Sequence, residues 1–564
     1  MLALFVLALV LRLYRLGEVP PGLHVDEAHN GVDALRIIAG ARPVFLEANN
    51  GREVLYSYVQ APLVALFGPT PWSLRLASAL LGSLTVPLTY VLVRTLPESR
   101  DRAVAAATAS LTALSLWHLH FSRIGIRGVA LPLVIVTLGI FLWRGIRSGR
   151  RSDHAAAGFV LGLGLYTHPA ARVLPAVPLL LLAYVVATDR GRSRATAIGL
   201  GWLIGAAVLT SLPLAVYVSQ HPGRIMSHPV AVSVLDREVA EGRPIEAVVC
   251  NVRDVAAAFV VEGSRSWYHN LSRRPVFDPL LAVFFVLGLG QLAWRLFASR
   301  SRAMRLEAAF VGLALTVMAL PTVLTDGAPN YSRAIGLLPV LFVPPALALV
   351  RASHWLADRA GRPKLSGPLV ALALCVSGLW TARDYFVTYA RAAEPQGVFG
   401  TEAVEKAVLL RALAQEGTVY PTTAILGRSV TKYLTHGADI VPLDLTEGVV
   451  VPPGPPARYA FAAGEEDEAA TDFGSTWPSL PRTTLTGRHG MPRWLLYGST
   501  AVPQPSSSTT AWLADGTELL GETLQPAVVA PGESPQLTLY WRSAGPLAKD
   551  YAVFVHVVDG GGQR

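Results

Sequence analysis

Long apolar segments separated by short polar connections occupy most of the chain up to about residue 390. A helix needs about 20 predominantly apolar residues to cross a bilayer. Segments near this length, several of them shorter, are expected to span the membrane at 1–16, 72–93, 103–119, 129–146, 155–169, 171–187, 195–218, 277–297, 306–324, 333–350 and 366–383. The pattern therefore predicts a polytopic α-helical membrane protein with about eleven spans.

Arginines mark every second connection between these segments. Short cytoplasmic loops carry an excess of Lys and Arg, so such an alternation indicates orientation. The arginine-rich connections contain Arg94, Arg100 and Arg102, then Arg144, Arg147, Arg150 and Arg151, then Arg190, Arg192 and Arg194, then Arg295, Arg300, Arg302 and Arg305, and finally Arg351, Arg359, Arg362 and Lys364. This order predicts a multi-pass protein of the plasma membrane with a cytoplasmic N-terminus and extracytoplasmic C-terminal domains.

One apolar run does not fit this count. The segment Val54–Phe67, VLYSYVQAPLVALF, has only about 14 residues and contains Pro62. Such a length suits an interfacial segment better than a span. Residues 17–71 are therefore interpreted as one long first outer loop that carries amphipathic helices.

Two further units are expected after the membrane part, 1–390. Residues 396–505 alternate helical patterns (VEKAVLLRALAQEG, GRSVTKYLTHG) with strand patterns (TVYPTTAIL, ADIVPLDL, RWLLYG), which indicates a small α/β domain. Residues 510–564 contain three strand patterns, TELLGETLQ, QLTLYWRS and YAVFVHVVD, separated by turn residues. The last unit is expected to be a truncated β-sandwich-like domain, because the chain stops at a turn.

Composition agrees with a membrane protein. Hydrophobic residues make up 52% of the chain and charged residues 15%, against about 25% charged in ordinary soluble domains. The formal net charge of +9 comes from arginines in loops and does not indicate a nucleic-acid partner. The two cysteines, Cys250 and Cys375, are not expected to form a disulfide or a metal cluster. The first segment has no positive region before it and no cleavage site after it, so we interpret it as a retained span.

An acidic pair, Asp26 and Glu27, follows the first span in the stretch HVDEAHNG. Burial of a charge in hydrocarbon costs roughly 3 kcal/mol or more, so these carboxylates need water or a partner. With histidines on both sides they are candidates for proton transfer. Asp26 is also a favoured residue at the start of a helix, a structural role compatible with catalysis.

Several motifs follow one another along the chain in an order that resembles that of a known protein superfamily. After the first span come PPGLHVDE and NNGRE, and further on PWSLRLASALLGSLTVPLTY, FSRIGIRGVALP and GLGLYTHPAARVLP. In this order the chain resembles the GT-C superfamily of membrane glycosyltransferases, with the greatest likeness to the protein O-mannosyltransferase and aminoarabinose-transferase (ArnT-like, glycosyltransferase family 39) branch. The resemblance covers most of residues 1–390.

This resemblance implies a GT-C fold, a polyprenyl-phosphate-linked sugar donor, and a hydroxyl acceptor on a protein, a lipid or a polysaccharide at the outer face. It implies that Asp26 is the catalytic base of a single displacement with inversion. Glu27 is expected either to orient a partner and contact the acceptor, or to stabilise the start of a helix through its dipole. The lipid phosphate that leaves needs positive charge.

Arginines at the outer ends of spans are the candidates for binding the donor phosphate, because the positive-inside trend disfavours them there. They are Arg123, Arg127, Arg172 and Arg333. The structural alternative is that they reach lipid headgroups. Further candidates for substrate contacts are His24, His29, Asn50, Arg52, His120, Tyr166, His168, His269, Asn270 and Asp326.

Histidines and carboxylates gather in the outer loops, a combination that suits zinc or manganese. The HLH spacing at 118–120 is not a tight ligand pattern, so hydrogen bonding to substrate is the favoured role, and a divalent metal remains the alternative with no cofactor required. The alternative functions are a transporter or flippase of lipid-linked glycans, a glycan polymerase or ligase, and a membrane scaffold. Transporters usually place ionisable residues within spans and show internal repeats, and neither feature is evident here.

Overall fold

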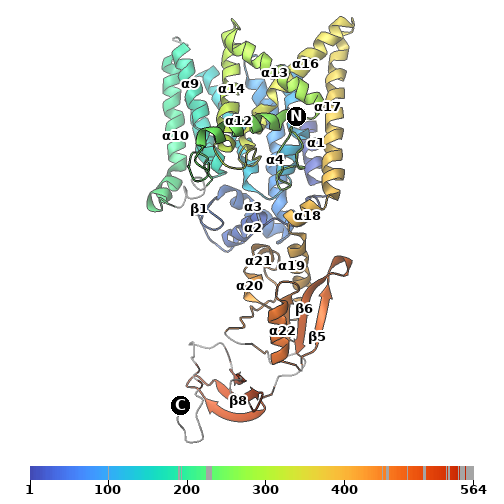
Figure 1. Ribbon diagram of the computed structural model, residues 1–564. Coiled ribbons are helices and arrows are strands. Elements are labelled where there is room, and N and C mark those ends of the chain that lie inside the picture. The colour runs from blue at the N-terminus through green and yellow to red at the C-terminus, as the bar shows by residue number, and fades with distance from the viewer. Residues whose placement is uncertain are drawn as a thin grey trace.

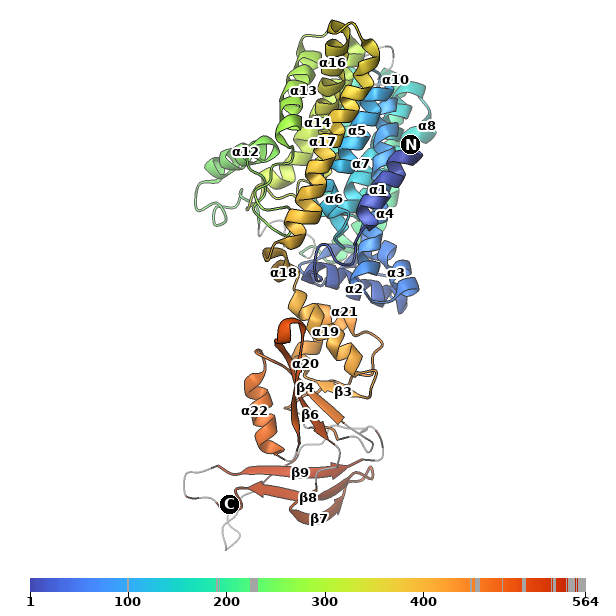
Figure 2. The ribbon, with the colours of Figure 1, turned by 90° about the vertical axis from the view of Figure 1, so that its right-hand side faces the viewer.

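A helical bundle forms one end of the molecule and two small β-containing units extend from it (Figures 1 and 2). This computed structural model describes residues 1–98, 101–188, 193–223, 232–446, 449–451, 457–478, 480–499, 504–528 and 534–543, together with positions 191, 530, 545, 553 and 555. Helices α2 and α3 lie across the end of the bundle that faces the small units (Figure 1).

Within the described residues, eight helical segments are long and apolar enough to cross a membrane. They are α4 (Pro71–Thr95), η1–α7 (Arg127–Ser148), η2–α9 (Pro169–Thr188), α10 (Ser193–Gln220), α13 (Pro279–Phe297), α14 (Arg302–Val323), η3–α16 (Ile335–Arg359) and η4–α17–η5 (Pro363–Tyr389). Shorter helices α1 (Leu2–Leu13), α5 (Arg102–Leu114) and α8 (Arg151–Gly164) fall on the other three expected segments. Each of the eleven segments thus contains a helix, and the chain is a multi-pass membrane protein.

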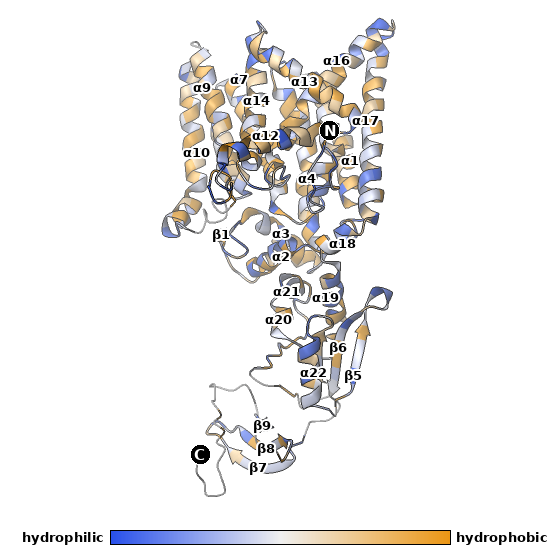
Figure 3. Ribbon diagram, viewed as in Figure 1, coloured by the Kyte–Doolittle hydropathy of each residue, from blue (hydrophilic) through white to orange (hydrophobic). Residues whose placement is uncertain are grey.

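Hydrophobic residues predominate along the helices of the bundle, including those at its edges (Figure 3). Leu209 on α10, Val286 on α13 and Leu379 on α17 are all more than half exposed. A helix that is apolar on its outer face needs a non-aqueous surround, and a bilayer supplies one. Inside the bundle, large side chains such as Trp117 and Trp143 are fully buried.

A separate layer covers the end of the bundle. It consists of α2 (Val25–Ile38), a small hairpin of β1 (Phe45–Leu46) and β2 (Arg52–Glu53), and α3 (Leu55–Phe67). Helix α3 packs against α2 and has only 13 residues. It lies across the bundle end (Figure 1), as expected for a surface segment interrupted by Pro62.

The first small unit is built on a four-stranded sheet of order β3-β4-β6-β5. Its elements are α18 (Glu394–Val398), α19 (Thr401–Leu413), β3 (Val419–Pro421), α20 (Thr423–Leu426), α21 (Ser429–Leu434), β4 (Ala457–Ala462), α22 (Asp467–Thr476), β5 (Arg482–Thr486) and β6 (Pro492–Ser499). Strands β3 and β4 pair in parallel and the others are antiparallel.

Two sequence predictions for this unit were wrong in part. The strand expected at ADIVPLDL makes only isolated bridges at Ile440 and Leu443, because Pro442 between them has no N–H to donate to a ladder. The strand expected over TVYPTTAIL ends at Pro421, and α20 begins two residues later.

The second small unit is an antiparallel sheet of order β7-β8-β9. Its strands are β7 (Ser507–Trp512), β8 (Glu518–Gln525) and β9 (Gln536–Arg542). Strands β8 and β9 fall where TELLGETLQ and QLTLYWRS predict them. The third predicted strand, YAVFVHVVD, lies almost wholly outside the described residues.

Tyr166, expected to line a sugar pocket, instead supports helix α10. Its hydroxyl accepts a hydrogen bond from the Leu214 N–H at 3.1 Å and donates one to the Thr210 carbonyl at 3.1 Å. These two groups flank Pro213, which cannot donate to the helical ladder. A side chain inserted at a proline is a recognised cause of helix bending.

We expect Tyr166→Phe to lower the free energy of unfolding by roughly 1–3 kcal/mol, since two hydrogen bonds of about 0.5–1.5 kcal/mol each are lost. The measurement is denaturant unfolding in detergent micelles, with Tyr184→Phe on the neighbouring helix α9 as the control. A variant that kept its stability but bound the sugar-linked donor more weakly would restore the sugar-pocket interpretation.

Candidate active site

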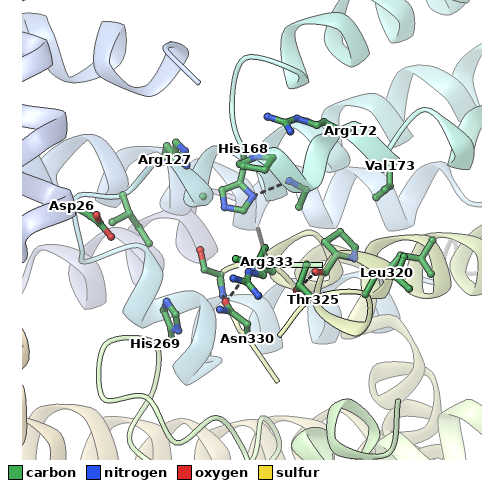
Figure 4. A pocket seen from close by; sticks show the side chains of 18 of the residues that line it. Asp26, Arg127, His168, Arg172, Val173, His269, Leu320, Thr325, Asn330 and Arg333 are labelled. Atoms are coloured by element: carbon green, nitrogen blue, oxygen red, sulfur yellow. Dashed lines mark hydrogen bonds between the residues drawn. The ribbon is translucent and has the colours of Figure 1, made fainter. Parts of the chain in front are cut away.

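A cavity of about 430 Å³ lies between the α2–α3 layer and the bundle. We call it the Asp26 cavity. The residues that line it come from six segments. They are Asp26 and Asn30 of α2, Arg127 of η1, His168 at the start of η2 and Arg172 within it, Tyr268 and His269 of the 261–278 loop, Leu320 and Leu324 at the end of α14 and just after it, and Asn330 and Arg333 before η3. Figure 4 shows Asp26 at one end and Val173 and Leu320 at the other, with the arginines between them. The cavity thus joins a polar end to an apolar end.

Asp26 lies in the first turn of α2 with its side chain 41% exposed. Asn49 donates a hydrogen bond to its Oδ1 at 2.9 Å, and the Tyr268 hydroxyl donates to its Oδ2 at 3.5 Å. Burial raises the pKa of Asp26, but the Asn49 hydrogen bond and the charges of Arg127 and Arg52 outweigh burial and hold the pKa below its usual value. At neutral pH the carboxylate is therefore ionised and able to accept a proton.

The helix start is organised by the neighbours of Asp26, not by Asp26 itself. His24 is the N-cap: its Nδ1 accepts a hydrogen bond from the Asp26 N–H at 3.1 Å. Glu27 completes the capping box by accepting from the His24 N–H at 3.0 Å. The expectation that Asp26 caps the helix was wrong, and its carboxylate is left for the cavity.

Glu27 points away from the Asp26 cavity and is completely buried. Its carboxylate accepts two hydrogen bonds from Arg75, at 2.9 and 3.1 Å, and one from the Gly125 N–H at 2.6 Å. Burial raises the pKa of Glu27, but the charge of Arg75 outweighs this and lowers it overall. The predicted catalytic or acceptor contact is therefore corrected to a structural role.

Three of the four predicted phosphate-binding arginines reach the cavity: Arg127, Arg172 and Arg333. Glu53, buried at the end of β2, accepts from Arg127 Nε and from Arg172 Nη2, each at 3.0 Å. Arg333 donates to Asp326 Oδ1 at 2.8 Å. Asp326, a predicted sugar contact, does not line the cavity and instead orients Arg333.

Arg123 does not reach the cavity. It is fully buried, and its guanidinium donates to the carbonyls of Leu11, Arg12 and Val19 at 2.8–2.9 Å. These carbonyls belong to the end of α1 and to the chain that follows it. Arg123 therefore ties the first helix to the bundle, and the phosphate-binding prediction is corrected.

Two of the predicted histidines line the cavity. His168 Nδ1 accepts from the Ala170 N–H at 3.2 Å, so in the neutral ring the proton is on Nε2. Burial and the nearby His120 lower the pKa of His269 to about 3, so it stays neutral. Neutral imidazoles suit hydrogen bonds to sugar hydroxyls. His120 is buried behind them and bonds to the Tyr268 carbonyl at 2.8 Å.

The remaining predicted contacts lie outside the cavity. His29 is half-buried on α2, and Asn50 is exposed in a left-handed turn. Arg52 is buried and pairs with Asp33 and Asn30. Asn270 is buried and donates to the carbonyls of Ser264 and Arg274.

Sequence reasoning missed Asn30, Glu53, Tyr268 and Asn330. Glu53 lies within the NNGRE motif, which was the only signal for it. In the described part of the chain, no three or more His, Cys, Asp or Glu side chains are grouped as a metal ion would require.

Comparison with known proteins adds the family context. Residues 52–217 match the family described as dolichyl-phosphate-mannose-protein mannosyltransferase. The crystal structure of ArnT from Cupriavidus metallidurans bound to undecaprenyl phosphate is similar over 89% of this chain and 99% of that one, at 17% identity and a TM-score of 0.51. The chain has the GT-C glycosyltransferase fold.

The GT-C fold is also that of the same enzyme in its apo state, with 16% identity, the same coverage and a TM-score of 0.52. No curated protein matches the sequence significantly. Residues 52–217 thus match a family of mannosyltransferases, and most of the chain shares the fold of ArnT, in agreement with the resemblance in the order of its motifs.

We expect Glu27→Gln to destabilise the protein by about 3–5 kcal/mol, because Arg75 would remain buried without its counter-charge. Since folding lowers the pKa of Glu27, its contribution is present above the unfolded value of about 4.3 and is lost as pH falls through the folded value. Denaturant unfolding measures both effects.

Glu18→Gln is the matched control, since Glu18 pairs with Arg15 at 2.6 Å but both side chains are exposed. Its removal should cost no more than about 1 kcal/mol. Equal stability of the two variants would contradict the structural role of Glu27.

Proposed function

We propose that the protein transfers a sugar from a polyprenyl-phosphate-linked donor to an acceptor hydroxyl, with Asp26 as the base. The observation that carries the proposal is the single cavity that joins an ionised carboxylate to three arginines and an apolar end. Each part matches one component of the reaction: an acceptor proton, a phosphate and a lipid chain. The ArnT structure bound to undecaprenyl phosphate supports the same class of donor.

The chemistry needs only one proton transfer. The acceptor hydroxyl gives its proton to Asp26 as its oxygen attacks the anomeric carbon. The bond from that carbon to the phosphate oxygen breaks, and the electron pair leaves with the lipid phosphate. Attack from the face opposite the phosphate inverts the anomeric configuration.

The arginines bind the phosphate and stabilise the charge that it gains. Guanidinium groups match phosphate oxygens geometrically and stay charged at any physiological pH. Glu53 and Asp326 fix the directions of these side chains before substrate arrives. The apolar side chains of Val173, Leu320 and Leu324 at the far end suit the first prenyl units of the donor.

The arginine-rich loops of alternate connections favour an extracytoplasmic position for the cavity. A protein, a lipid or a polysaccharide hydroxyl fits the acceptor role equally. A flippase would bind the same lipid but would release the sugar still attached to phosphate, which separates the two functions in an assay.

Asp26→Asn should abolish transfer from labelled polyprenyl-phosphate hexoses, because the amide cannot take the acceptor proton. Ionisation of the base should not limit wild-type transfer until the pH is below the ordinary Asp pKa of about 3.9, because the pKa of Asp26 is lowered. The control is Asp472→Asn, an exposed carboxylate on α22. Equal transfer by wild type and Asp26→Asn would rule out Asp26 as the base.

Arg333→Ala should weaken binding of undecaprenyl phosphate by about tenfold or more, because a hydrogen bond to a charged group contributes about 1.5–3 kcal/mol. Binding is measured by thermal-shift titration of the purified protein in detergent. Arg265→Ala is the matched control, since Arg265 is an exposed arginine of the 261–278 loop that pairs with Glu262. Undiminished binding by Arg333→Ala would remove Arg333 from the phosphate site.

A further inference from the structure

The α/β unit contacts the start of helix α2 through Phe399, which follows α18 and lies in the short connection to α19. Phe399 is completely buried, and its carbonyl accepts a hydrogen bond from the Leu23 N–H at 2.7 Å. Gly22 has φ +66°, and a Cβ there would lie 2.3 Å from the Phe399 oxygen. Only glycine permits this close approach of two backbones, which is made four residues before Asp26.

The Phe399 ring packs against two of the side chains that position Asp26. Its centroid lies 6.1 Å from that of His24 and 5.6 Å from that of Tyr268. His24 caps the helix of Asp26, Tyr268 donates to the Asp26 carboxylate, and the two rings stack at 3.8 Å. The guanidinium of Arg75 lies 6.0 Å from the Phe399 centroid. One side chain from the α/β unit therefore touches the cap of α2, a hydrogen-bond donor to Asp26 and the counter-ion of Glu27.

A second contact fixes α2 from its other side. Tyr433 on α21 is completely buried, and its hydroxyl lies 3.2 Å from Ser73 Oγ and donates to the Thr70 carbonyl at 3.2 Å. Its ring lies directly against Gly31 of α2, where a Cβ would come within 2.6 Å of the ring.

An apolar cluster completes the contact between α2 and α21, and it includes Ala28, Ala34, Val430 and Leu434. Figure 2 shows α19 and α21 directly beneath α2.

We propose that the α/β unit positions the base of the transferase, with Phe399 as the positioning residue that acts on Asp26 through His24 and Tyr268. This proposal rests on the proposed function of Asp26. The base is then held in place by a residue 373 positions away in sequence, at the point where the α/β unit meets helix α2.

The geometry around Asp26 explains why such support is needed. Its side chain is partly exposed and has side-chain hydrogen bonds from Asn49 and Tyr268. Without the Phe399 ring, His24 and Tyr268 lose an aromatic neighbour on one side, and the stack can shift. A misplacement of about 1 Å in a reacting group can cost about 100-fold in rate.

The test compares Phe399→Ala with Phe399→Leu in the full-length protein in nanodiscs. Phe399→Ala should lower kcat by about 10- to 100-fold and leave KM for the polyprenyl-phosphate hexose within about threefold, because the arginines are untouched. Phe399→Leu fills most of the volume and should restore kcat to within about fivefold of wild type.

Hydrogen–deuterium exchange supplies a readout that needs no turnover. In Phe399→Ala, amides of residues 23–31 should exchange faster than in wild type, whereas those of α7 and α14 should not change. The absence of any sugar transfer by the wild type would overturn the proposed function alone. The exchange measurement would still test whether Phe399 holds the start of α2 in place.

Phe473→Ala is the matched control. Phe473 is a buried aromatic residue of the same unit that packs against Tyr459, Phe461 and Tyr497, within the unit's own core. It should loosen that core while kcat and exchange in α2 stay near wild type. Wild-type kcat and exchange in Phe399→Ala would overturn the proposal. Equal losses of kcat in Phe399→Ala and Phe473→Ala would also overturn it, because they would show only that activity requires a folded α/β unit.

Discussion

The buried carboxylate of Glu27 holds together three parts of the chain that are distant in sequence. It receives hydrogen bonds from Arg75 on α4, from the Gly125 N–H after α6 (Leu116–Phe121), and from the His24 N–H at the start of α2. Consecutive residues of a helix point about 100° apart. Once Glu27 is fixed toward the interior, Asp26 must point elsewhere, and the side it faces is the cavity. In the proposed reaction the two neighbouring acids therefore have different roles: Glu27 anchors the structure and Asp26 accepts the proton.

Much of the fold could be predicted from hydrophobic pattern alone, because lipid requires long apolar helices. The pattern also identified Val54–Phe67 as a surface segment from its length and its proline. What it could not decide was whether α1, α5 and α8 cross the membrane by themselves, since their helices are shorter than a bilayer requires. Strand predictions failed where a proline or a following short helix ended the ladder.

For the site, charge and position were better guides than residue type. Asp26, Arg127, Arg172 and Arg333 were predicted as site residues because charges at the outer ends of apolar segments are disfavoured, and the structure brings all four to one cavity. Arg123 satisfies the same rule, yet it binds three backbone carbonyls, and no sequence pattern distinguishes a carbonyl partner from a phosphate. Tyr268 and Phe399 could not be predicted, because their roles depend on contacts between segments more than 100 residues apart.

Glu53 has a consequence for turnover. In the proposed reaction the bound phosphate changes from a diester with one negative charge to a monoester, whose charge at neutral pH is between about −1.5 and −2. Arginines without a neighbouring carboxylate would therefore bind the lipid phosphate product more tightly than the donor. By sharing one carboxylate between Arg127 and Arg172, Glu53 offsets part of their charge. A carboxylate inside the phosphate site would then favour dissociation of the lipid phosphate. The product could diffuse away in the membrane, and a new donor could bind in the cavity.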